Sequence, residues 1–346
     1  MMRIGVIGYG YWGPNLVRNF AEAAGSQVTM VSDLSADRLA QATRRYPSLR
    51  ATQDAHALLQ DKAVDLVAIA TPVSTHFDLA MEALRAGKHV LVEKPLAANS
   101  EQGLRLMEEA ERRRLVLMVD HTFVYTGAVR KIRELVTGKT IGDIYYYDSV
   151  RVNLGLFQHD VNVIWDLAVH DLSIMDHLLD ARPIAVSATG MSHVPGQPEN
   201  IAFLTLFFQD NLIAHLHLNW ISPVKVRRTL IGASQKMIVY DDMEVTEKVK
   251  VYDKGITVAP NLDSLYRINV SYRTGDMWAP NVPVTEALEV EAQHMIECIE
   301  KGARPITDAE AGLRVVRILE AATESMKQRG NPVELGRGKG PAWSHS

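Results

Sequence analysis

The chain has 346 residues, of which 47% are hydrophobic and 23% are charged, and its formal net charge at pH 7 is −4. This composition excludes an intrinsically disordered, collagen-like or low-complexity protein, and the length predicts about two domains. A protein that holds nucleic acid by charge is normally strongly basic, so the acidic balance argues against a nucleic-acid partner.

The single cysteine, Cys298, cannot form an internal disulfide. A lone thiol fits a reducing compartment, so we expect a cytoplasmic protein. No apolar run reaches the roughly 18 residues that span a bilayer, and the N-terminus lacks a signal-peptide pattern, so we expect no membrane association. The histidines have no C-x-x-C spacing beside them, and the sequence predicts no metal site.

Residues 3–120 alternate short apolar runs with amphipathic stretches of helical length, which predicts a parallel sheet covered by helices on both faces. Pro14 suits the first turn of a helix, Gly87 suits a helix end, and Asn99 with Gln102 forms a plausible capping box. The expected strands are Ile4–Ile7, Val28–Val31, Leu66–Ala70, Val90–Val92 and Leu115–Val119, and the expected helices are Asn15–Ala24, Ala36–Tyr46, Thr75–Ala86 and Glu101–Arg114.

After about residue 140 the apolar runs are longer and partly alternating, which predicts an antiparallel sheet. The expected strands here are Ile144–Val152, Ile201–Phe208, Leu212–Trp220 and Lys225–Ile231, and the expected helices are Ile164–Leu179, Glu286–Lys301 and Asp308–Gln328. We therefore expect a dinucleotide-binding domain at 1–122, a substrate and oligomerisation domain at 123–337 whose late helices could return to the first domain, and a loose tail at 338–346.

A glycine-rich turn, Gly8-Tyr9-Gly10-Tyr11-Trp12-Gly13, follows the first predicted strand and opens a predicted helix. The first glycine permits the tight turn, the second lets backbone approach a pyrophosphate, and the third allows close helix–strand packing. The helix N-terminus presents N–H groups to an anion. The turn therefore predicts a dinucleotide site.

Asp33 directly follows the second predicted strand, 20 positions after Gly13. A carboxylate there can accept hydrogen bonds from an adenosine ribose and would repel a 2′-phosphate, which favours NAD(H) over NADP. The alternative is an ordinary strand–helix turn in which Asp33 caps the next helix.

Three further motifs accompany this turn: Thr71-Pro72 with His76, Glu93-Lys94-Pro95 after the run Val90–Val92, and Asp166 with His170. In this combination the chain resembles the Gfo/Idh/MocA family of sugar oxidoreductases over nearly its whole length. The resemblance implies an N-terminal Rossmann domain with a doubly wound parallel sheet, and a C-terminal α/β domain with an open, mainly antiparallel sheet. It also implies that Thr71, Pro72, His76, Glu93 and Lys94 edge the nicotinamide of NAD(H), although His76 could equally be a helix-entry residue.

Two stretches, Asp148–Gln158 and Val163–Leu172, resemble family members of surface-polysaccharide and nucleotide-sugar pathways, some of which are UDP-N-acetylglucosamine-type 3-dehydrogenases or 3-ketoreductases. Where many members carry a glycine run, this chain has Asn162-Val163-Ile164-Trp165. The resemblance implies a sugar or nucleotide-sugar substrate and assembly through the open sheet, as a homodimer or homotetramer.

Lys94, Asp166 and His170 are the expected catalytic residues. Lys94 ends a strand of the predicted sheet, where open α/β sheets bind ligands, and its ammonium group could stabilise charge on a substrate oxygen. Asp166 and His170 are four residues apart on a predicted helix and share a face. His170 or Lys94 would exchange the hydroxyl proton during hydride transfer, and the sequence leaves open which one does so. The non-catalytic alternatives are that Lys94 is simply solvated, that Asp166 complements the helix N-terminus, and that His170 is a packed histidine.

Tyr125, Arg151, Asn153 and Trp220 resemble positions that could line the sugar or nucleotide pocket, although buried packing is the usual role of such aromatic residues. His215 and His217 share a strand face without an evident third metal ligand, so an interface role is preferred. The leading prediction is an NAD(H)-dependent dehydrogenase or reductase that acts on a sugar, with a nucleotide-linked sugar favoured. Three alternatives stay open: an inositol or free-sugar dehydrogenase, an NAD-dependent glycosidase, and a non-catalytic NAD(H)-binding sensor.

Overall fold

A computed structural model describes residues 1–155, 161–259 and 269–336 of the chain. The predicted tail 338–346 lies outside these residues, as do Phe157 and Gln158 at the end of one family-like stretch. No helix in the described part of the chain combines the length and the hydropathy needed to cross a bilayer.

The chain falls into two compact units, each built from segments that are separate in sequence. The first unit comprises Met1–Arg133, Leu172–Leu178 and Val282–Arg317, and the second comprises Glu134–Asp171, Leu179–Asn281 and Ile318–Ser346. The continuous domains 1–122 and 123–337 remain a prediction.

A six-stranded sheet in the order β3-β2-β1-β4-β5-β6 forms the centre of the first unit, and all neighbouring strands in it are parallel. Its order reverses between β1 and β4, and such a reversal is the place where open α/β sheets bind ligands. The predicted doubly wound sheet is therefore confirmed. The strands are β1 (Met2–Ile7), β2 (Ser26–Ser32), β3 (Arg50–Thr52), β4 (Leu66–Ile69), β5 (His89–Glu93) and β6 (Leu117–Asp120).

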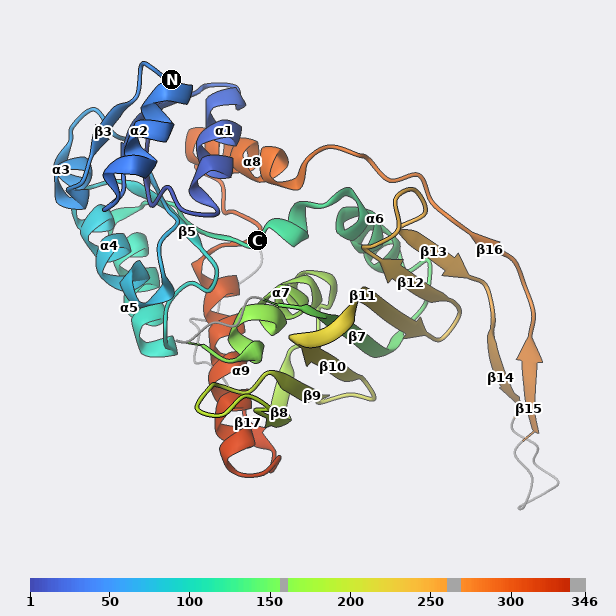
Figure 1. Ribbon diagram of the computed structural model, residues 1–346. Coiled ribbons are helices and arrows are strands. Elements are labelled where there is room, and N and C mark those ends of the chain that lie inside the picture. Colours follow the sequence, from blue (N-terminus) through green and yellow to red (C-terminus); the bar gives the residue numbers. More distant parts are fainter. Residues whose placement is uncertain (156–160, 260–268, 337–346) are drawn as a thin grey trace. The chain divides into compact units, whose positions relative to one another are not determined.

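Helices cover both faces of this sheet. Successive side chains of a strand point to opposite faces, so neighbouring residues of β1 contact different helices. Ile4 and Val6 of β1 pack in one buried cluster with side chains from α1, α2 and α8, whereas Gly5 faces Leu58 of α3. Figure 1 shows α8, from late in the chain, lying along α1. The helices with residues in this unit are α1 (Gly13–Glu22), α2 (Ala36–Arg45), α3 (Ala55–Gln60), α4 (Val73–Arg85), α5 (Ser100–Arg113), a 3-10 helix η1 (Thr122–Tyr125), α6 (Gly127–Thr137), α7 (Val169–Leu178), α8 (Ala287–Lys301) and the first part of α9 (Ala309–Lys327).

The helix boundaries follow the local signals, with one correction. Pro14 lies in the first turn of α1, and Gly87, at φ +77°, follows α4. The side chain of Asn99 accepts the N–H of Gln102 at 2.9 Å and so caps α5. The Oε1 atom of Gln102 has no hydrogen-bond partner among the described residues, so the reciprocal half of the predicted capping box is wrong.

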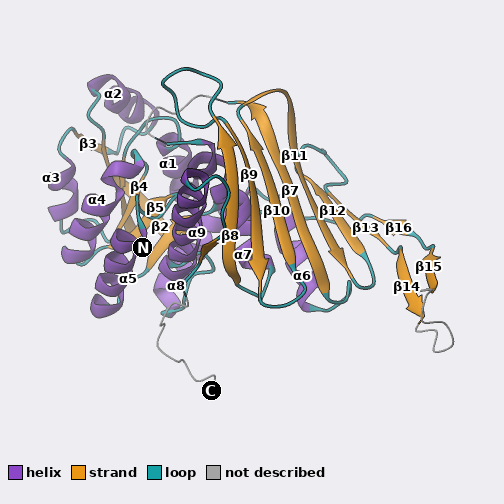
Figure 2. Ribbon diagram, turned by 90° about the horizontal axis from the view of Figure 1, so that it is seen from below, coloured by secondary structure: helices purple, strands orange, loops and turns teal. Residues whose placement is uncertain are grey.

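The second unit contains a nine-stranded sheet in the order β16-β13-β12-β11-β7-β10-β9-β8-β17, which Figure 2 shows face on. All of its pairs are antiparallel except β7 with β10, so the predicted mainly antiparallel sheet is confirmed. A separate hairpin joins β14 and β15. The strands are β7 (Ile144–Leu154), β8 (Pro183–Met191), β9 (Ile201–Phe208), β10 (Ile213–Asn219), β11 (Ile221–Ala233), β12 (Met237–Asp241), β13 (Val249–Tyr252), β14 (Gly255–Ala259), β15 (Asn269–Arg273), β16 (Met277–Trp278) and β17 (Val333–Glu334).

The predicted helix Ile164–Leu179 is not a regular α-helix throughout. Its first residues, Ile164–Ala168, form a π-helical turn named η2, and the α-helix α7 begins at Val169. Single π-turns of this kind occur frequently at functional sites. Asp166 therefore lies in a wider turn than the sequence pattern predicts.

Candidate active site

The glycine-rich turn has the backbone geometry that close approach to a phosphate requires. Gly8 has φ +93°, and a Cβ atom there would collide with the carbonyl oxygen of Ala70. A Cβ atom on Gly13 would collide with the carbonyl oxygen of Gly8. At Gly10 the nearest atom to an added Cβ is Nη1 of Arg38, 3.6 Å away, so this backbone is open. The turn and the following helix α1 therefore fit a dinucleotide phosphate.

The three aromatic residues of the turn lie in different surroundings. Tyr9 is buried in the hydrophobic cluster, whereas the side chain of Tyr11 is 92% exposed. The indole nitrogen of Trp12 donates a 2.5 Å hydrogen bond to Oδ2 of Asp120. Tyr11 is the most exposed of the three, while the partly buried Trp12 connects the turn to the end of β6.

Asp33 lies beside this turn, at the end of β2, as predicted. Its two carboxylate oxygens accept the backbone N–H groups of Tyr9 at 2.7 Å and Ser35 at 2.8 Å. Each carboxylate oxygen has a second lone pair that can accept a ribose hydroxyl. Nη1 of Arg38 lies 3.6 Å from Oδ2 of Asp33. The surroundings of the glycine-rich turn thus carry both a negative and a positive side chain.

Thr71, Pro72 and His76 follow β4 at the same edge of the sheet. The hydroxyl of Thr71 is hydrogen-bonded to that of Thr75 at 2.7 Å, and Pro72 precedes α4. His76 is buried, and its ring nitrogens lie 2.9 Å from the carbonyl oxygens of Pro95 and Thr71. Burial lowers the pKa of His76, and the nearby charge of Lys94 also lowers it. His76 therefore holds together the loops that follow β4 and β5.

Glu93 is the last residue of β5, and Lys94 directly follows it. The peptide bond between Lys94 and Pro95 is cis. The next strand, β6, ends in Asp120, which is hydrogen-bonded to both Trp12 and Thr122. Sequence reasoning missed Asp120. The signal that could have found it is its position directly after an apolar run, which matches that of Asp33.

In the second unit, Asp166 and Trp220 are brought together. The indole nitrogen of Trp220 donates a 3.0 Å hydrogen bond to Oδ2 of Asp166, and the side chain of Trp220 is 1% exposed. Trp220 therefore orients Asp166 rather than lining an open pocket. His170, at the start of α7, is half-buried.

Arg151 and Tyr125, both predicted to line the substrate pocket, lie in buried internal contacts. The guanidinium group of Arg151, which is 4% exposed, bonds both carboxylate oxygens of Asp171 at 2.7 and 3.2 Å. The hydroxyl group of Tyr125 lies 2.9 Å from Oγ1 of Thr307, and its side chain is 2% exposed. Both side chains are thus buried in internal contacts, which is the usual role of an aromatic residue such as Tyr125, and a pocket-lining role for them stays a prediction. Asn153 lies half-buried near the end of β7.

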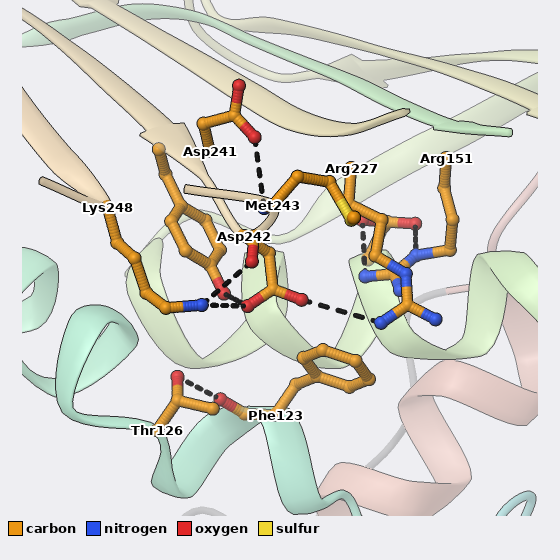
Figure 3. Close-up of polar contacts among 10 residues, drawn as sticks. Phe123, Thr126, Arg151, Arg227, Asp241, Asp242, Met243 and Lys248 are labelled. Carbon is orange, nitrogen blue, oxygen red and sulfur yellow. Dashed lines mark hydrogen bonds and ion pairs between the residues drawn. The ribbon is translucent and has the colours of Figure 1, made fainter. Parts of the chain in front are cut away.

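Arg227 lies opposite Arg151 on the neighbouring strand β11. Asp242 compensates the charge of Arg227 with an ion pair at 3.4 Å, and it also accepts a 3.1 Å bond from Nζ of Lys248. Figure 3 shows Arg227 and Lys248 reaching Asp242, with Arg151 beside Arg227. Two like charges on adjacent strands are thus each balanced by a carboxylate.

The face of the second sheet that carries His215 and His217 is partly aromatic. Phe203 stacks on His217 with ring centroids 4.5 Å apart, and Nδ1 of His215 lies 3.5 Å from Asp148. No group of three or more His, Cys, Asp or Glu side chains within the described ranges is arranged to hold a metal ion.

Comparison with known proteins places these features in a family. A family model described as "Oxidoreductase family, NAD-binding Rossmann fold" matches residues 2–121. Residues 129–239 match the GFO/IDH/MocA C-terminal domain, and residues 268–335 match the oxidoreductase family C-terminal alpha/beta domain. The chain is 30% identical over 335 residues to a UDP-N-acetylglucosamine 3-dehydrogenase of Acidithiobacillus ferrooxidans, with 95% of this chain and 99% of the relative covered.

The chain belongs to the Gfo/Idh/MocA family. The predicted resemblance is therefore confirmed, and the protein is an oxidoreductase with an NAD-binding Rossmann domain. A solved structure of the Acidithiobacillus enzyme superposes with a TM-score of 0.79 at 28% identity, covering 94% of this chain and 98% of that chain. A second relative in the family, scyllo-inositol 2-dehydrogenase (NADP(+)) of Bacillus subtilis, is 25% identical over 348 residues, with 95% of this chain and 94% of the relative covered.

Lys94 belongs to the first unit, whereas Asp166 and His170 belong to the second. Each unit thus carries part of the predicted set of catalytic residues.

Proposed function

We propose that this protein transfers a hydride between NAD(H) and a hydroxyl or keto carbon of a nucleotide-linked sugar, with position 3 of a UDP-N-acetylglucosamine-type sugar as the leading candidate. The observation that carries this proposal is the full-length similarity to the Acidithiobacillus 3-dehydrogenase. The chain also contains Lys94, Asp166 and His170, whose side chains can bind and exchange a hydroxyl proton. The inositol dehydrogenase among the relatives favours one second candidate, an inositol or free-sugar dehydrogenase.

The residues that would hold the dinucleotide are the backbone of Gly8–Gly13, the carboxylate of Asp33 and the loop residues Thr71 and Pro72. Bound NAD(H) would supply the hydride acceptor or donor. Asp33 supports NAD(H) because its carboxylate would repel a 2′-phosphate. Arg38, 3.6 Å from Asp33, is a group beside it that would favour NADP(H).

The protein's own groups would move the proton. The ammonium group of Lys94 would donate a hydrogen bond to the substrate oxygen and stabilise negative charge as the hydroxyl proton leaves. The imidazole of His170 would accept that proton in the oxidation direction and return it in reduction, and Lys94 is the alternative proton acceptor. Asp166, held by the indole of Trp220, would orient the imidazole or a sugar hydroxyl.

The open face of the second sheet supports self-association as a homodimer or homotetramer. Tyr146, Ile213 and Phe207 lie opposite one another on β7, β10 and β9. His217 and Phe203 form a further pair, four residues along β10 from Ile213. Phe203 is 42% exposed and Ile213 is 47% exposed. An exposed aromatic and aliphatic sheet face of this kind is typical of an interface. The expected setting is the cytoplasm, without a nucleic-acid partner.

A substrate screen tests the proposal. Purified protein is incubated with NAD⁺ or NADP⁺ and a panel of UDP- and dTDP-linked sugars, free sugars and inositols, and nicotinamide reduction is followed by absorbance. Reduction of NAD⁺ with UDP-N-acetylglucosamine-type sugars is the expected result. Selective reaction with inositols would establish the second candidate instead. Release of an aglycone without net NADH would indicate a glycosidase, and cofactor binding without any turnover would indicate a sensor.

A further inference from the structure

A pair of buried carboxyl groups lies beneath the glycine-rich turn. Asp120 is 2% exposed and Glu291, on α8, is 0% exposed. Asp120 accepts hydrogen bonds of 2.5 Å from the indole nitrogen of Trp12 and from the hydroxyl of Thr122. Neither carboxyl oxygen of Glu291 has an N–H or O–H donor within hydrogen-bonding distance among the described residues, and its neighbours are the carboxyl group of Asp120 and the hydroxyl of Thr122.

Two buried carboxyl groups in contact do not both ionise, because each charge would lack water and would repel the other. Burial raises the pKa of Asp120 above its ordinary value, although the hydrogen bonds from Thr122 and Trp12 and the charge of Lys94 act in the opposite direction. Burial raises the pKa of Glu291 well above its usual range, and the negative charge of Asp120 raises it further. Because Trp12 and Thr122 donate hydrogen bonds to Asp120, Asp120 is the member that ionises more readily, and a proton on Glu291 can form a hydrogen bond to Asp120.

We propose that Asp120 and Glu291 form a carboxyl pair sharing one proton, which positions Trp12 of the glycine-rich turn and places a fixed negative charge beside Lys94. This inference rests on the proposed function for the role of Lys94 but not for the role of Trp12. Asp120 and Glu291 are positioning residues here, because they act through Trp12 and Lys94.

Asp120 and Glu291 have different roles in this pair. Asp120 holds Trp12, which lies between Gly10 and Gly13, so the pair restrains the backbone expected to meet the phosphates. Glu291 supplies the hydrogen bond that lets a carboxylate stay charged in the interior.

Several other titratable groups lie near Asp120 and Lys94. Besides Asp120 and Glu291, the neighbours that sense the same charges are Glu93 on β5, His121 after β6 and His76 on α4. Burial keeps both histidines neutral near pH 7, because it lowers their pKa. The acidic groups near Lys94 in these interactions include Asp120 and Glu93, which directly precedes Lys94 in the chain.

Four variants of the full-length protein separate these tasks: Trp12→Phe, Asp120→Asn, Glu291→Gln and Glu291→Leu. Glu289→Gln, on the exposed side of the same helix, is the matched control. The readouts are NADH affinity by fluorescence titration, the pH dependence of kcat, and the infrared C=O stretch of a protonated carboxyl group at about pH 8.

Trp12→Phe is expected to weaken NADH binding about tenfold and to leave the pH dependence unchanged, because only the hydrogen bond is removed. Asp120→Asn is expected to weaken NADH binding and also to change the pH dependence of kcat, because the negative charge of the carboxyl pair is lost. Glu291→Gln should retain most of the activity that Glu291→Leu loses, since its amide can still donate to Asp120. The infrared band of a protonated carboxyl should be present in the wild type and in Glu289→Gln and absent from Glu291→Gln.

The pair is refuted if that band is unchanged by Glu291→Gln, or if Asp120→Asn leaves both NADH affinity and the pH dependence at wild-type values. These outcomes are distinct from failure of the proposed function. A protein that binds NADH but turns over no sugar would refute the proposed function, while the affinity and infrared comparisons would still decide whether the pair exists.

Discussion

The indole nitrogen of Trp12 and the carboxylate of Asp120, 108 positions apart in sequence, are joined by a 2.5 Å hydrogen bond. Trp12 belongs to the turn after β1, whereas Asp120 ends β6, and the strands β4 and β5 lie between these two in the sheet. The turn expected to bind phosphate is therefore held by a residue outside the glycine motif. The conformation of this turn depends on β6, the strand at the edge of the sheet, as well as on the turn's own glycines.

Asp33 is expected to set the preference between the two nicotinamide dinucleotides. Asp33→Ser should weaken NADH binding about tenfold, because a charged acceptor for the ribose is lost. NADPH binding should strengthen, because Arg38 would then face a 2′-phosphate without a competing carboxylate. Fluorescence titration with NADH and NADPH measures both effects. Asp37→Ser, in the exposed first turn of α2, is the control. An unchanged ratio of the two affinities in Asp33→Ser would contradict the assignment.

The buried ion pair Arg151–Asp171 is expected to be essential for the stability of the second unit. Arg151→Met should lower the free energy of unfolding by about 3–5 kcal/mol, because it leaves a buried carboxylate without its counter-charge. Arg228→Met, which breaks an ion pair to Asp241 from a side chain that is 54% exposed, should cost less than about 1 kcal/mol. Urea unfolding compares the two variants, and equal losses would show that burial does not distinguish these pairs.

Trp220 is expected to act on turnover through Asp166. Trp220→Phe keeps an aromatic ring in the buried site but removes the donor to Oδ2 of Asp166, so kcat should fall about tenfold. NADH affinity should not change, because the expected nucleotide-binding residues lie elsewhere in the chain. Steady-state kinetics and fluorescence titration measure these quantities. The partly exposed Trp278→Phe is the control, and a wild-type kcat in Trp220→Phe would remove Asp166 orientation from the mechanism.

His121 is expected to make the protein less stable in mild acid. Burial lowers its pKa to about 4, and neither ring nitrogen has a hydrogen-bond partner among the described residues. The unfolded chain, with an ordinary histidine pKa of about 6.5, therefore binds more protons between these values, so stability falls as the pH drops from about 6.5 to 4. At pH 5 this single group should account for about 2 kcal/mol of lost stability.

His121→Gln should remove that part of the pH dependence, as measured by urea unfolding at about pH 7 and pH 5. The exposed His56 has a pKa raised by its hydrogen bond to Glu82, which is the opposite sign, so His56→Gln should not reduce the loss in acid. If His121→Gln loses as much stability on acidification as the wild type does, His121 is not the residue responsible.

The sequence by itself determined the parallel sheet of the first unit and the turn after β1. Strands buried on both faces appear as continuous apolar runs such as Leu66–Ile69, and this signal is local. Part of the glycine requirement is local too, because the carbonyl oxygen of Gly8 excludes a side chain at Gly13 and Gly8 itself has a positive φ. The clash of a Gly8 side chain with Ala70 depends instead on the neighbouring strand β4. Asp33 could be placed because the length of one strand–helix–strand unit sets its spacing from the turn. The short strand β3 was missed, since Arg50-Ala51-Thr52 has no apolar run.

Only the tertiary structure decided which polar groups meet. Nothing near Asp120 or Glu291 in sequence shows that α8 returns to the end of β6, and nothing near Arg151 shows that Asp171 compensates its charge. The same holds for Trp220, whose position on the strand indicates packing but not its bond to Asp166. The physical reason is that these contacts join segments distant in the chain. Their energies depend on burial and on the orientation of the partner, which local residue patterns do not contain.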